Sequence, residues 1–311
     1  MERREPFCRD TFDAELKVAQ EKSKRLRPFR TVFLIVSGLV VIASFAGRIS
    51  EWAILISLIP LVFLGAQAGK ARSSITKLMR DTRLRHDVLK DTFDLIEYDP
   101  HRLIDESLLQ EGRFNYHWDS RFSRDYIRAR YRGVEFVLAD VELSIFHLQM
   151  RSRSSSTANI VLFKGPWLVI TSQKEICPSV VISQRKSPKA KKGEFPGLKP
   201  LKTESDVQME NLAFDETFWT FSDDSLMPYR VLTPHFMEFI LLAREAADGA
   251  KHVCFTGDRV HVAVHNGRNL FGLCQKAKNF SEFRAGMEQD INYIKAIIDE
   301  FLLNEQLFDP Q

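Results

Sequence analysis

The first quarter of the chain carries two apolar runs, at residues 31–47 and 52–68. Each run lacks an ionisable side chain, and the short stretch between them carries Arg48 and Glu51. At about 1.5 Å per residue, a helix over either run would be roughly 25 Å long, near the roughly 30 Å hydrocarbon core of a bilayer. A single helix over both runs would bury two charges near the bilayer centre. The pattern therefore predicts a two-helix transmembrane hairpin over 31–68.

Basic residues on both flanks predict the orientation of this hairpin. Six Lys or Arg residues lie between 17 and 30, six lie between 70 and 85, and the tip has only Arg48. Positive residues favour the cytoplasmic side, so we expect both termini in the cytoplasm of a multi-pass inner-membrane protein. The long polar segment 1–30 disfavours a cleaved signal peptide. A soluble α-hairpin is the alternative, but it normally has a polar face.

The segment after the hairpin changes to a helical pattern. Apolar residues recur at roughly helical spacing over 73–98, until Asp99-Pro100 interrupts the pattern. A short helix over 101–110 is expected to end at Gly112. Residues 70–112 are therefore predicted to be a juxtamembrane helical stem.

From residue 125 onward the pattern alternates with period two, which is typical of strands. We expect strands over 125–150 with a turn at Arg132-Gly133, and further strands at 159–172 (broken at Gly165-Pro166), 179–183, 212–221, 229–232, a hairpin at 251–264 and a strand near 269–273.

Two helices are expected among and after these strands. Thr233-Pro234 has the N-cap and first-turn residues of a helix that ends near Gly249, and a second helix begins near Ser281. The sequence thus predicts a cytosolic α+β domain over 113–303, with a mostly antiparallel sheet packed with helices and a tail at 304–311. A pleckstrin-homology-like curved sheet is compatible with this order.

Composition narrows the classes of function. The chain has 44 Lys and Arg against 41 Asp and Glu, a net charge of +3, which is no signature of nucleic-acid binding. Four cysteines lie far apart without a CxxC pair, so a disulfide framework or a zinc ribbon is not expected. Residues 184–205 are rich in Lys, Pro and Gly and are predicted to be a mobile basic loop.

Two groups of basic residues are candidates for a membrane or partner surface. Arg124, Arg128, Arg130 and Arg132 form a basic stretch, and alternation puts the last three on one strand face. Lys189, Lys191 and Lys192 lie in the basic loop. Either group could contact anionic lipid headgroups or an acidic protein surface, although a solvated strand face and a disordered loop would show the same residues.

One possible metal-binding face lies in the predicted hairpin. With a turn at Gly257-Asp258, a valine face packs in the core, and the other face carries His252, Cys254, His261 and His265. Cross-strand neighbours of these types can bind Zn²⁺. Without a CxxC or HExxH framework, a half-exposed sheet face is the favoured interpretation, and we expect no metal or cofactor.

Catalytic signatures are sparse. Asp223-Asp224 could hold Mg²⁺ or act as acid and base, but this segment is also typical of a turn between strands. No GxxxxGK[ST], GxGxxG, HExxH or GxSxG motif occurs. An enzyme is therefore not the leading interpretation.

The cytosolic region resembles the bacterial membrane proteins described as domain of unknown function 3137, over most of 93–303. Asp125-Tyr126, Glu142-Leu143 and Phe163-x-Gly165 resemble its strand motifs. The most specific block is ENLAFDETFWTFSDDSLMPYRVLTPHF, in which Phe214, Phe218, Ser222, Asp224, Arg230, Leu232, Thr233 and Pro234 match the family pattern. Pro228-Tyr229 departs from that pattern, as does the basic insertion. The resemblance implies an architecture with two N-terminal spans in many members, and no established activity.

These observations predict a membrane-anchored, non-enzymatic protein whose cytosolic domain binds a protein partner or the anionic inner leaflet. One alternative is a membrane-associated enzyme on a lipid-like substrate, using Asp223-Asp224 or the histidine face. Another is an oligomeric membrane scaffold, because small residues in the spans could let helices associate.

Overall fold

The structure is a computed structural model, and its chain forms two compact units. One unit comprises residues 1–88 and 273–287, and the other comprises 89–272 and 288–311. The described residues are 9–45, 66, 82–114, 117–151, 154–185, 205–246, 249–272, 274, 277 and 279–307.

The first unit contains the long helix α1 (Arg9–Phe45) and the start of α8 (Phe280–Leu307). The ring of Phe12 lies 5.7 Å from the rings of both Phe280 and Phe283. The backbone N–H of Phe280 donates to Oδ1 of Asp13 at 2.7 Å. Aromatic packing and a capping carboxylate thus join the beginnings of the two helices.

Helix α1 does not reproduce the predicted boundary at residue 31. It includes Pro28 and continues from the polar N-terminal segment into the first apolar run. In the described part of the chain, no helix has the length and apolar character needed to cross a membrane. The second predicted span, 52–68, lies outside the described residues apart from Ala66. The structure therefore gives no support to the hairpin predicted over 31–68.

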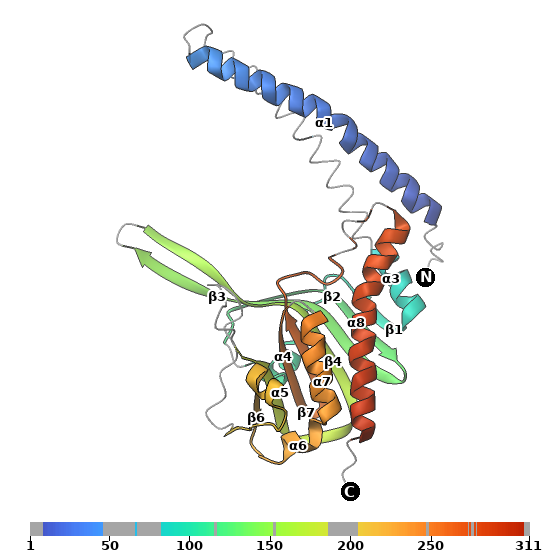
Figure 1. Cartoon of the computed structure of the whole chain (residues 1–311). Helices are drawn as coiled ribbons and strands as arrows, with labels where there is room; N and C mark the ends of the chain where they lie inside the picture. The colour runs from blue at the N-terminus through green and yellow to red at the C-terminus, as the bar shows by residue number, and fades with distance from the viewer. Residues whose placement is uncertain are drawn as a thin grey trace. The chain divides into compact units, whose positions relative to one another are not determined.

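The second unit is built on a seven-stranded sheet in which the pairings between the described strands are antiparallel (Figure 1). The order is β1-β2-β3-β4-β6-β5, and β7 also pairs with β4. The strands are β1 (Asp94–Asp99), β2 (Ser120–Tyr131), β3 (Val134–Arg151), β4 (Ser154–Gln184), β5 (Ser205–Asp206), β6 (Phe218–Ser222) and β7 (Ala250–His265).

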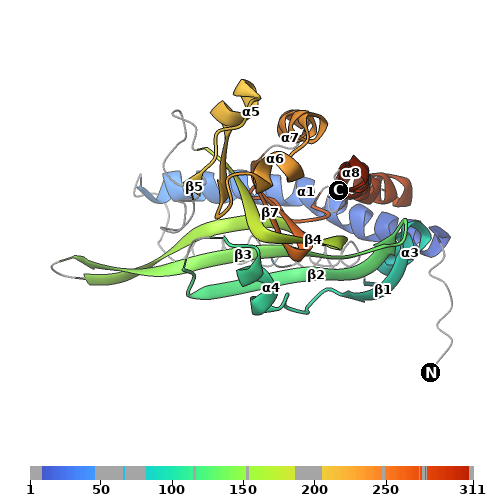
Figure 2. The ribbon, with the colours of Figure 1, turned by 90° about the horizontal axis from the view of Figure 1, so that it is seen from below.

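Helices cover both faces of this sheet (Figure 2). One face packs under α4 (Glu106–Glu111), around a core that includes Phe114, Phe163 and Trp167. On the opposite face lie α7 (Pro234–Ala246) and α8. The remaining helices are α3 (Thr82–Thr92), α5 (Leu212–Thr217) and α6 (Met227–Val231). The predicted mixed α+β class with a large antiparallel sheet is confirmed.

Local sequence signals are accurate where a turn or cap decides the structure. Arg132 and Gly133 have positive φ values of 50° and 81° between β2 and β3, as the predicted turn requires. Oγ1 of Thr233 accepts the N–H of Phe236 at 3.2 Å, which caps α7. Oδ1 of Asn279 accepts the N–H of Glu282 at the start of α8.

Strand predictions fail where pairing between distant segments decides the structure. The hairpin predicted over 251–264 is one strand, β7, which pairs with β4 from Trp167↔Ala263 to Ser183↔His252. Register shifts between Thr171 and Val180 of β4 accommodate the extra residues of β4 at this point. The strand β4 likewise continues through Gly165-Pro166.

Four shorter segments also have a secondary structure that differs from the prediction. Residues 94–99 of the predicted stem form β1, residues 212–217 and 227–231 are helical, and residues 270–272 form turns. Short apolar segments carry too few residues for the period to distinguish a strand from a helix.

The strands β3 and β4 extend beyond the rest of the sheet. The pairing of β2 with β3 ends at Ser120↔Ser144, and that of β7 with β4 ends at Trp167↔Ala263. Residues 145–151 and 154–160 pair with each other and with no other described strand. Both views show them projecting from the sheet as a two-stranded arm (Figures 1 and 2). We call residues 145–160 the ribbon.

A substitution at Gly165 tests whether β4 passes close to β7 at this residue. Its φ is +152°, and a Cβ there would lie 2.1 Å from the carbonyl oxygen of Val264 on β7. Gly133 also has a positive φ, but a Cβ there would meet nothing within 4 Å. We expect Gly165→Ala to lower the free energy of unfolding by about 3 kcal/mol or more, and Gly133→Ala by about 1 kcal/mol. Urea denaturation measures both, and equal losses would contradict the close approach of β4 and β7.

Candidate functional site

An exposed apolar patch lies where the ribbon leaves the sheet. Phe122 on β2, Phe146 on β3 and Val161 on β4 are 52%, 53% and 39% exposed. We call these residues the ribbon-base patch. Large exposed side chains that gather on one face are typical of interaction surfaces, whereas isolated ones are ordinary.

Strand register places the three residues on one face. Phe122 pairs with Glu142, Ser144 pairs with Val161, and Phe146 follows Glu142 and Ser144 at alternate positions of β3. The intervening residues Val141 and Leu143 point to the buried core under α4. The patch is therefore on the face opposite α4.

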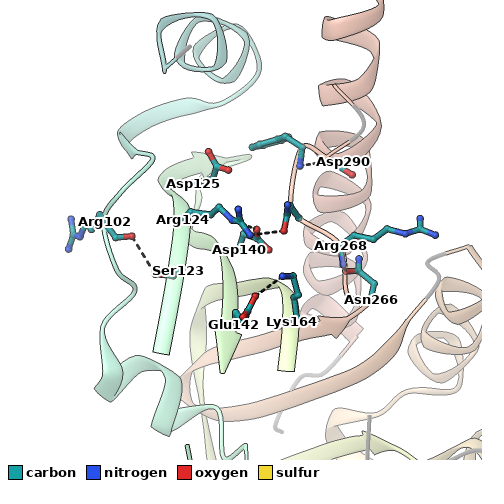
Figure 3. A network of polar contacts seen from close by, with 12 residues as sticks. Arg102, Ser123, Arg124, Asp125, Asp140, Glu142, Lys164, Asn266, Arg268 and Asp290 are labelled. Atoms are coloured by element: carbon teal, nitrogen blue, oxygen red, sulfur yellow. Dashed lines mark hydrogen bonds and ion pairs between the residues drawn. The ribbon is translucent and has the colours of Figure 1, made fainter. Parts of the chain in front are cut away.

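Charged pairs lie on the same face of the sheet as Phe122, and Figure 3 shows these pairs. Nε of Arg124 donates to Oδ2 of Asp140 at 2.8 Å, and its Nη2 donates to Oδ1 of Asn269 at 2.6 Å. Nζ of Lys164 lies 2.6 Å from Oε2 of Glu142, the cross-strand partner of Phe122. The guanidinium of Arg124 also lies 5.5 Å from the ring centre of Phe122. Glu142 and Ser144 lie between the three apolar residues in the strand register, so this face carries exposed apolar side chains and ion pairs side by side.

Asp140 is the most deeply buried carboxylate in this border, with 2% of its side chain exposed. Burial raises its pKa to about 6, although Arg124 and a backbone hydrogen bond from Leu270 act in the opposite direction. Its charged form therefore depends on Arg124.

Further hydrogen bonds hold the segment 266–272 against the sheet. The backbone N–H groups of Asn266 and Gly267 donate to the carbonyl oxygen of Lys164. The N–H of Phe271, whose φ is 55°, donates to Oδ2 of Asp290 on α8 at 2.8 Å (Figure 3). Burial raises the pKa of Asp290 as well. The network thus fixes the chain beside the patch.

The predicted arginine surface is divided by a bulge in β2. The register shifts between Arg124 and Ile127, where Asp125 has a φ of 51°. This extra residue puts Arg128 and Arg130 on the face opposite Arg124. Arg132 lies in the following turn, so the expectation that Arg128, Arg130 and Arg132 share one strand face is wrong.

Each of these arginines also contacts a carboxylate. Arg128 and Arg130 lie 2.5 and 3.3 Å from the oxygens of Glu135, and the hydrogen bond from Arg128 lowers the pKa of Glu135. Arg132 lies 2.8 Å from Asp299 on α8. These contacts reduce the positive potential that an anionic surface would meet. Lys189, Lys191 and Lys192 lie outside the described residues.

The histidine face is in the core. His252, Cys254 and His261 are at most 1% exposed, since α4 and the segment after it cover them. Nε2 of His252 donates to the carbonyl oxygen of Gly112 at 2.6 Å, and Nε1 of Trp167 donates to Nδ1 of His261 at 3.4 Å. Burial lowers the pKa of His252 to about 4 and that of His261 to about 3. The prediction of a half-exposed sheet face is wrong.

His265 has a separate role. Its Nδ1 accepts the backbone N–H of Lys164 at 3.0 Å. Among the described residues, no group of three or more His, Cys, Asp and Glu side chains is placed to hold a metal ion. The four residues proposed as alternative zinc ligands are therefore not brought together as one ligand set.

Asp223-Asp224 has the geometry of a turn. Oγ of Ser222 accepts the N–H of Asp224 at 3.3 Å, and Oδ1 of Asp224 accepts the N–H of Leu226 at 2.8 Å. These local hydrogen bonds are those expected of Ser and Asp in turns. The segment is a turn, but it leads from β6 into helix α6 rather than into a second strand as predicted.

A small apolar cavity lies between the sheet and helices α7 and α8. Its volume is about 30 Å³, and its lining includes Val253, Val260, Phe236, Ile240 and Tyr293. Burial raises the pKa of Tyr293 to about 12. A cavity of this size holds about one water molecule, which is less than a lipid chain occupies.

Together, the fold and this surface define a mixed α+β protein with an antiparallel sheet and an exposed apolar patch. A family model described as "Protein of unknown function (DUF3137)" matches residues 161–303, somewhat less than half of the chain. The predicted resemblance to this domain of unknown function is supported over those residues.

No curated protein matches the chain. One solved structure that is similar is the crystal structure of the mycobacterial trehalose monomycolate transport factor A, TtfA, with 12% sequence identity and a TM-score of 0.35. The match covers 68% of this chain and 94% of that one.

Sequence reasoning did not predict the ribbon-base patch or its border. Asp140 and Glu142 interrupt the apolar pattern of β3 at alternate positions, which was a usable signal for a polar strip on one face. The exposure of Phe122 and Phe146 had no such signal, because it depends on where the neighbouring strands end.

The dependence of Asp140 on Arg124 is testable. Arg124→Ala leaves a buried carboxylate without its cation, so we expect a loss of about 3–5 kcal/mol in the free energy of unfolding at pH 8. Arg132→Ala removes a pair whose arginine is 63% exposed, and should cost at most about 1 kcal/mol. Chemical denaturation measures both. Adding Asp140→Asn to Arg124→Ala should recover part of the loss, and no recovery would contradict the assigned role.

The buried histidines predict a loss of stability in acid. Their folded pKa values lie below the ordinary 6.5, so the unfolded chain binds more protons below that pH. The free energy of unfolding should therefore fall as the pH decreases from about 6.5 toward 4, by an amount on the order of a few kcal/mol.

His252→Gln, which retains a donor for the carbonyl oxygen of Gly112, should reduce this pH dependence. His117→Gln is the matched control, because His117 is 91% exposed. Equal pH profiles for His252→Gln and the parent would refute the prediction.

Proposed function

We propose that this is a membrane-anchored, non-enzymatic protein whose sheet domain binds a protein partner through the ribbon-base patch. The observation that carries the proposal is the exposure of Phe122, Phe146 and Val161 on one face, beside a fixed polar border. Aromatic side chains are enriched in the centres of protein interfaces.

The membrane anchor is the part of the proposal that rests on sequence. Two uncharged runs, at 31–47 and 52–68, with basic flanks support a two-span hairpin with both termini in the cytoplasm. The resemblance to bacterial membrane proteins of unknown function supports an inner-membrane location.

A protein partner is favoured over the anionic leaflet because of how the charges lie. Arg124, Arg128, Arg130 and Arg132 each contact a carboxylate, whereas the patch presents uncharged apolar surface. Binding of anionic headgroups through Lys189, Lys191 and Lys192 is the second candidate.

A role as an enzyme has less support. The candidate acids Asp223 and Asp224 belong to a turn, and His252 and His261 lie in the core. The apolar cavity is smaller than a lipid chain.

Site-specific photocrosslinking in cells that naturally make the protein tests the proposal. We expect a photoreactive residue at Phe122 or Phe146 of the full chain to give a discrete adduct with another protein. The same residue at Leu226, which is 61% exposed at the start of α6, is the control.

Two results would overturn the proposal. One is the absence of a protein adduct at Phe122, and the other is the same adduct pattern at Leu226. A flotation assay tests the alternative in which the protein binds the anionic leaflet. The full chain is held in nanodiscs without detergent, and its binding to anionic vesicles is measured by co-flotation. Binding that is lost in Lys189→Ala/Lys191→Ala/Lys192→Ala and retained in Phe122→Asp would favour the leaflet.

A further inference from the structure

Three polar side-chain atoms in the core beneath α4 have no hydrogen-bond partner among the described residues. They are Nδ1 of His252, Nε2 of His261 and Oγ of Ser183. The three side chains are at most 1% exposed, and the core around them includes Phe114 and Trp167. A buried polar group without a partner destabilises the folded state, and native structures leave few of them. These three atoms therefore point to a small polar ligand inside the core.

The hydrogen bonds at the other ring nitrogens fix the tautomers of the two histidines. Nε2 of His252 lies 2.6 Å from the carbonyl oxygen of Gly112, which can only accept, so Nε2 carries the proton and Nδ1 is an acceptor. Nδ1 of His261 accepts the indole N–H of Trp167 at 3.4 Å, so in this ring Nε2 carries the proton and is a donor. Burial lowers the pKa of both rings, which keeps both neutral. One ring thus needs a donor and the other needs an acceptor.

The contacts place the two rings and the hydroxyl of Ser183 close together. The ring centre of Trp167, which bonds His261, lies 6.4 Å from that of His252. A Cβ on Gly112, whose oxygen bonds His252, would lie 3.2 Å from Nδ1 of His261. Ser183 is the direct cross-strand partner of His252, so their Cβ atoms are about 5 Å apart on one face of the sheet. Polar atoms at such a spacing are commonly joined by a water molecule.

We propose that one buried water molecule binds between His252, His261 and Ser183. The water accepts the Nε2–H of His261, and it donates one hydrogen to Nδ1 of His252 and the other to Oγ of Ser183. Three hydrogen bonds are the usual number for a buried water. The bound water gives each of the three atoms a partner that the described side chains and backbone do not supply.

The tautomers favour water over a metal ion. A metal binds a ring nitrogen that carries no proton, and at His261 that nitrogen already accepts from Trp167.

The packing also favours a ligand as small as water. The chain at Gly112 lies so close to the sheet that even a Cβ would be 2.6 Å from Cζ2 of Trp167. The site lies beneath α4, on the face opposite the ribbon-base patch, so this inference is independent of the proposed protein partner.

A high-resolution crystal structure of the full chain tests the proposal directly. We expect density for one water whose oxygen lies about 2.7–3.2 Å from Nδ1 of His252, Nε2 of His261 and Oγ of Ser183. A well-ordered core without this density would refute the proposal, as would a direct hydrogen bond between Ser183 and His252. An atom about 2.0–2.1 Å from both ring nitrogens would indicate a metal and would refute it equally.

Ser183→Ala tests the same site by the direction of its effect. If the hydroxyl binds the water, its removal takes away one of the water's partners. We then expect the unfolding equilibrium constant of the full chain in nanodiscs, measured by urea denaturation, to rise at least about fivefold. Removal of a hydroxyl that has no partner leaves the stability unchanged or increases it. A Ser183→Ala variant as stable as the parent would therefore contradict the proposal.

Thr220→Val is the matched control for Ser183→Ala. Thr220 is 1% exposed, and its hydroxyl has no partner in the part of the chain that the structure describes. It pairs with Ile182, the neighbour of Ser183, so alternation puts it on the other face of the sheet. We expect Thr220→Val to change the unfolding equilibrium constant less than about twofold. An equal rise in both variants would count against a water specific to Ser183.

Discussion

The strand β4 is the constraint on which the rest of the sheet depends. It pairs with β3 from Ser154 to Ile170, with β7 from Trp167 to Ser183, and with β6 from Val180 to Gln184. Its backbone hydrogen bonds therefore connect β3 to both β6 and β7, and β5 joins the sheet through β6. The close approach of Gly165 to Val264 belongs to this pairing. A change that bends or shortens β4 would affect both faces of the sheet at once.

The candidate surface follows from unequal strand lengths. At Ser144, which pairs with the first residue of β2, the edge of β3 loses its neighbouring strand, and Phe122, Phe146 and Val161 lie near that point. Behind this point, three contacts hold the segment 266–272 in place: Asn269 accepts from Arg124, the carbonyl oxygen of Lys164 accepts two backbone N–H groups, and Asp290 accepts the N–H of Phe271. A rigid polar border beside apolar surface gives a partner a fixed shape to bind.

Burial changes the meaning of residue types that suggested chemistry. His252 and His261 are of a residue type that binds metals, but they lie beneath α4, where burial lowers their pKa values. They form hydrogen bonds with Gly112 and Trp167. Arg128 and Arg130 have the composition of a basic surface, but Glu135 lies between them. In both cases the surroundings come from residues distant in sequence, so composition could not reveal them.

The sequence by itself determined the local features: the turn at Arg132-Gly133, the cap of α7 at Thr233, the start of α8 and the α+β class. Neighbouring residues specify these, through φ preferences, side-chain caps and periodicity. Only the tertiary structure decided that β7 is one strand, that a bulge puts Arg124 and Arg128 on opposite faces, and that the ribbon extends beyond the neighbouring strands. These features depend on register, and a shift of one residue between distant strands exchanges the two faces.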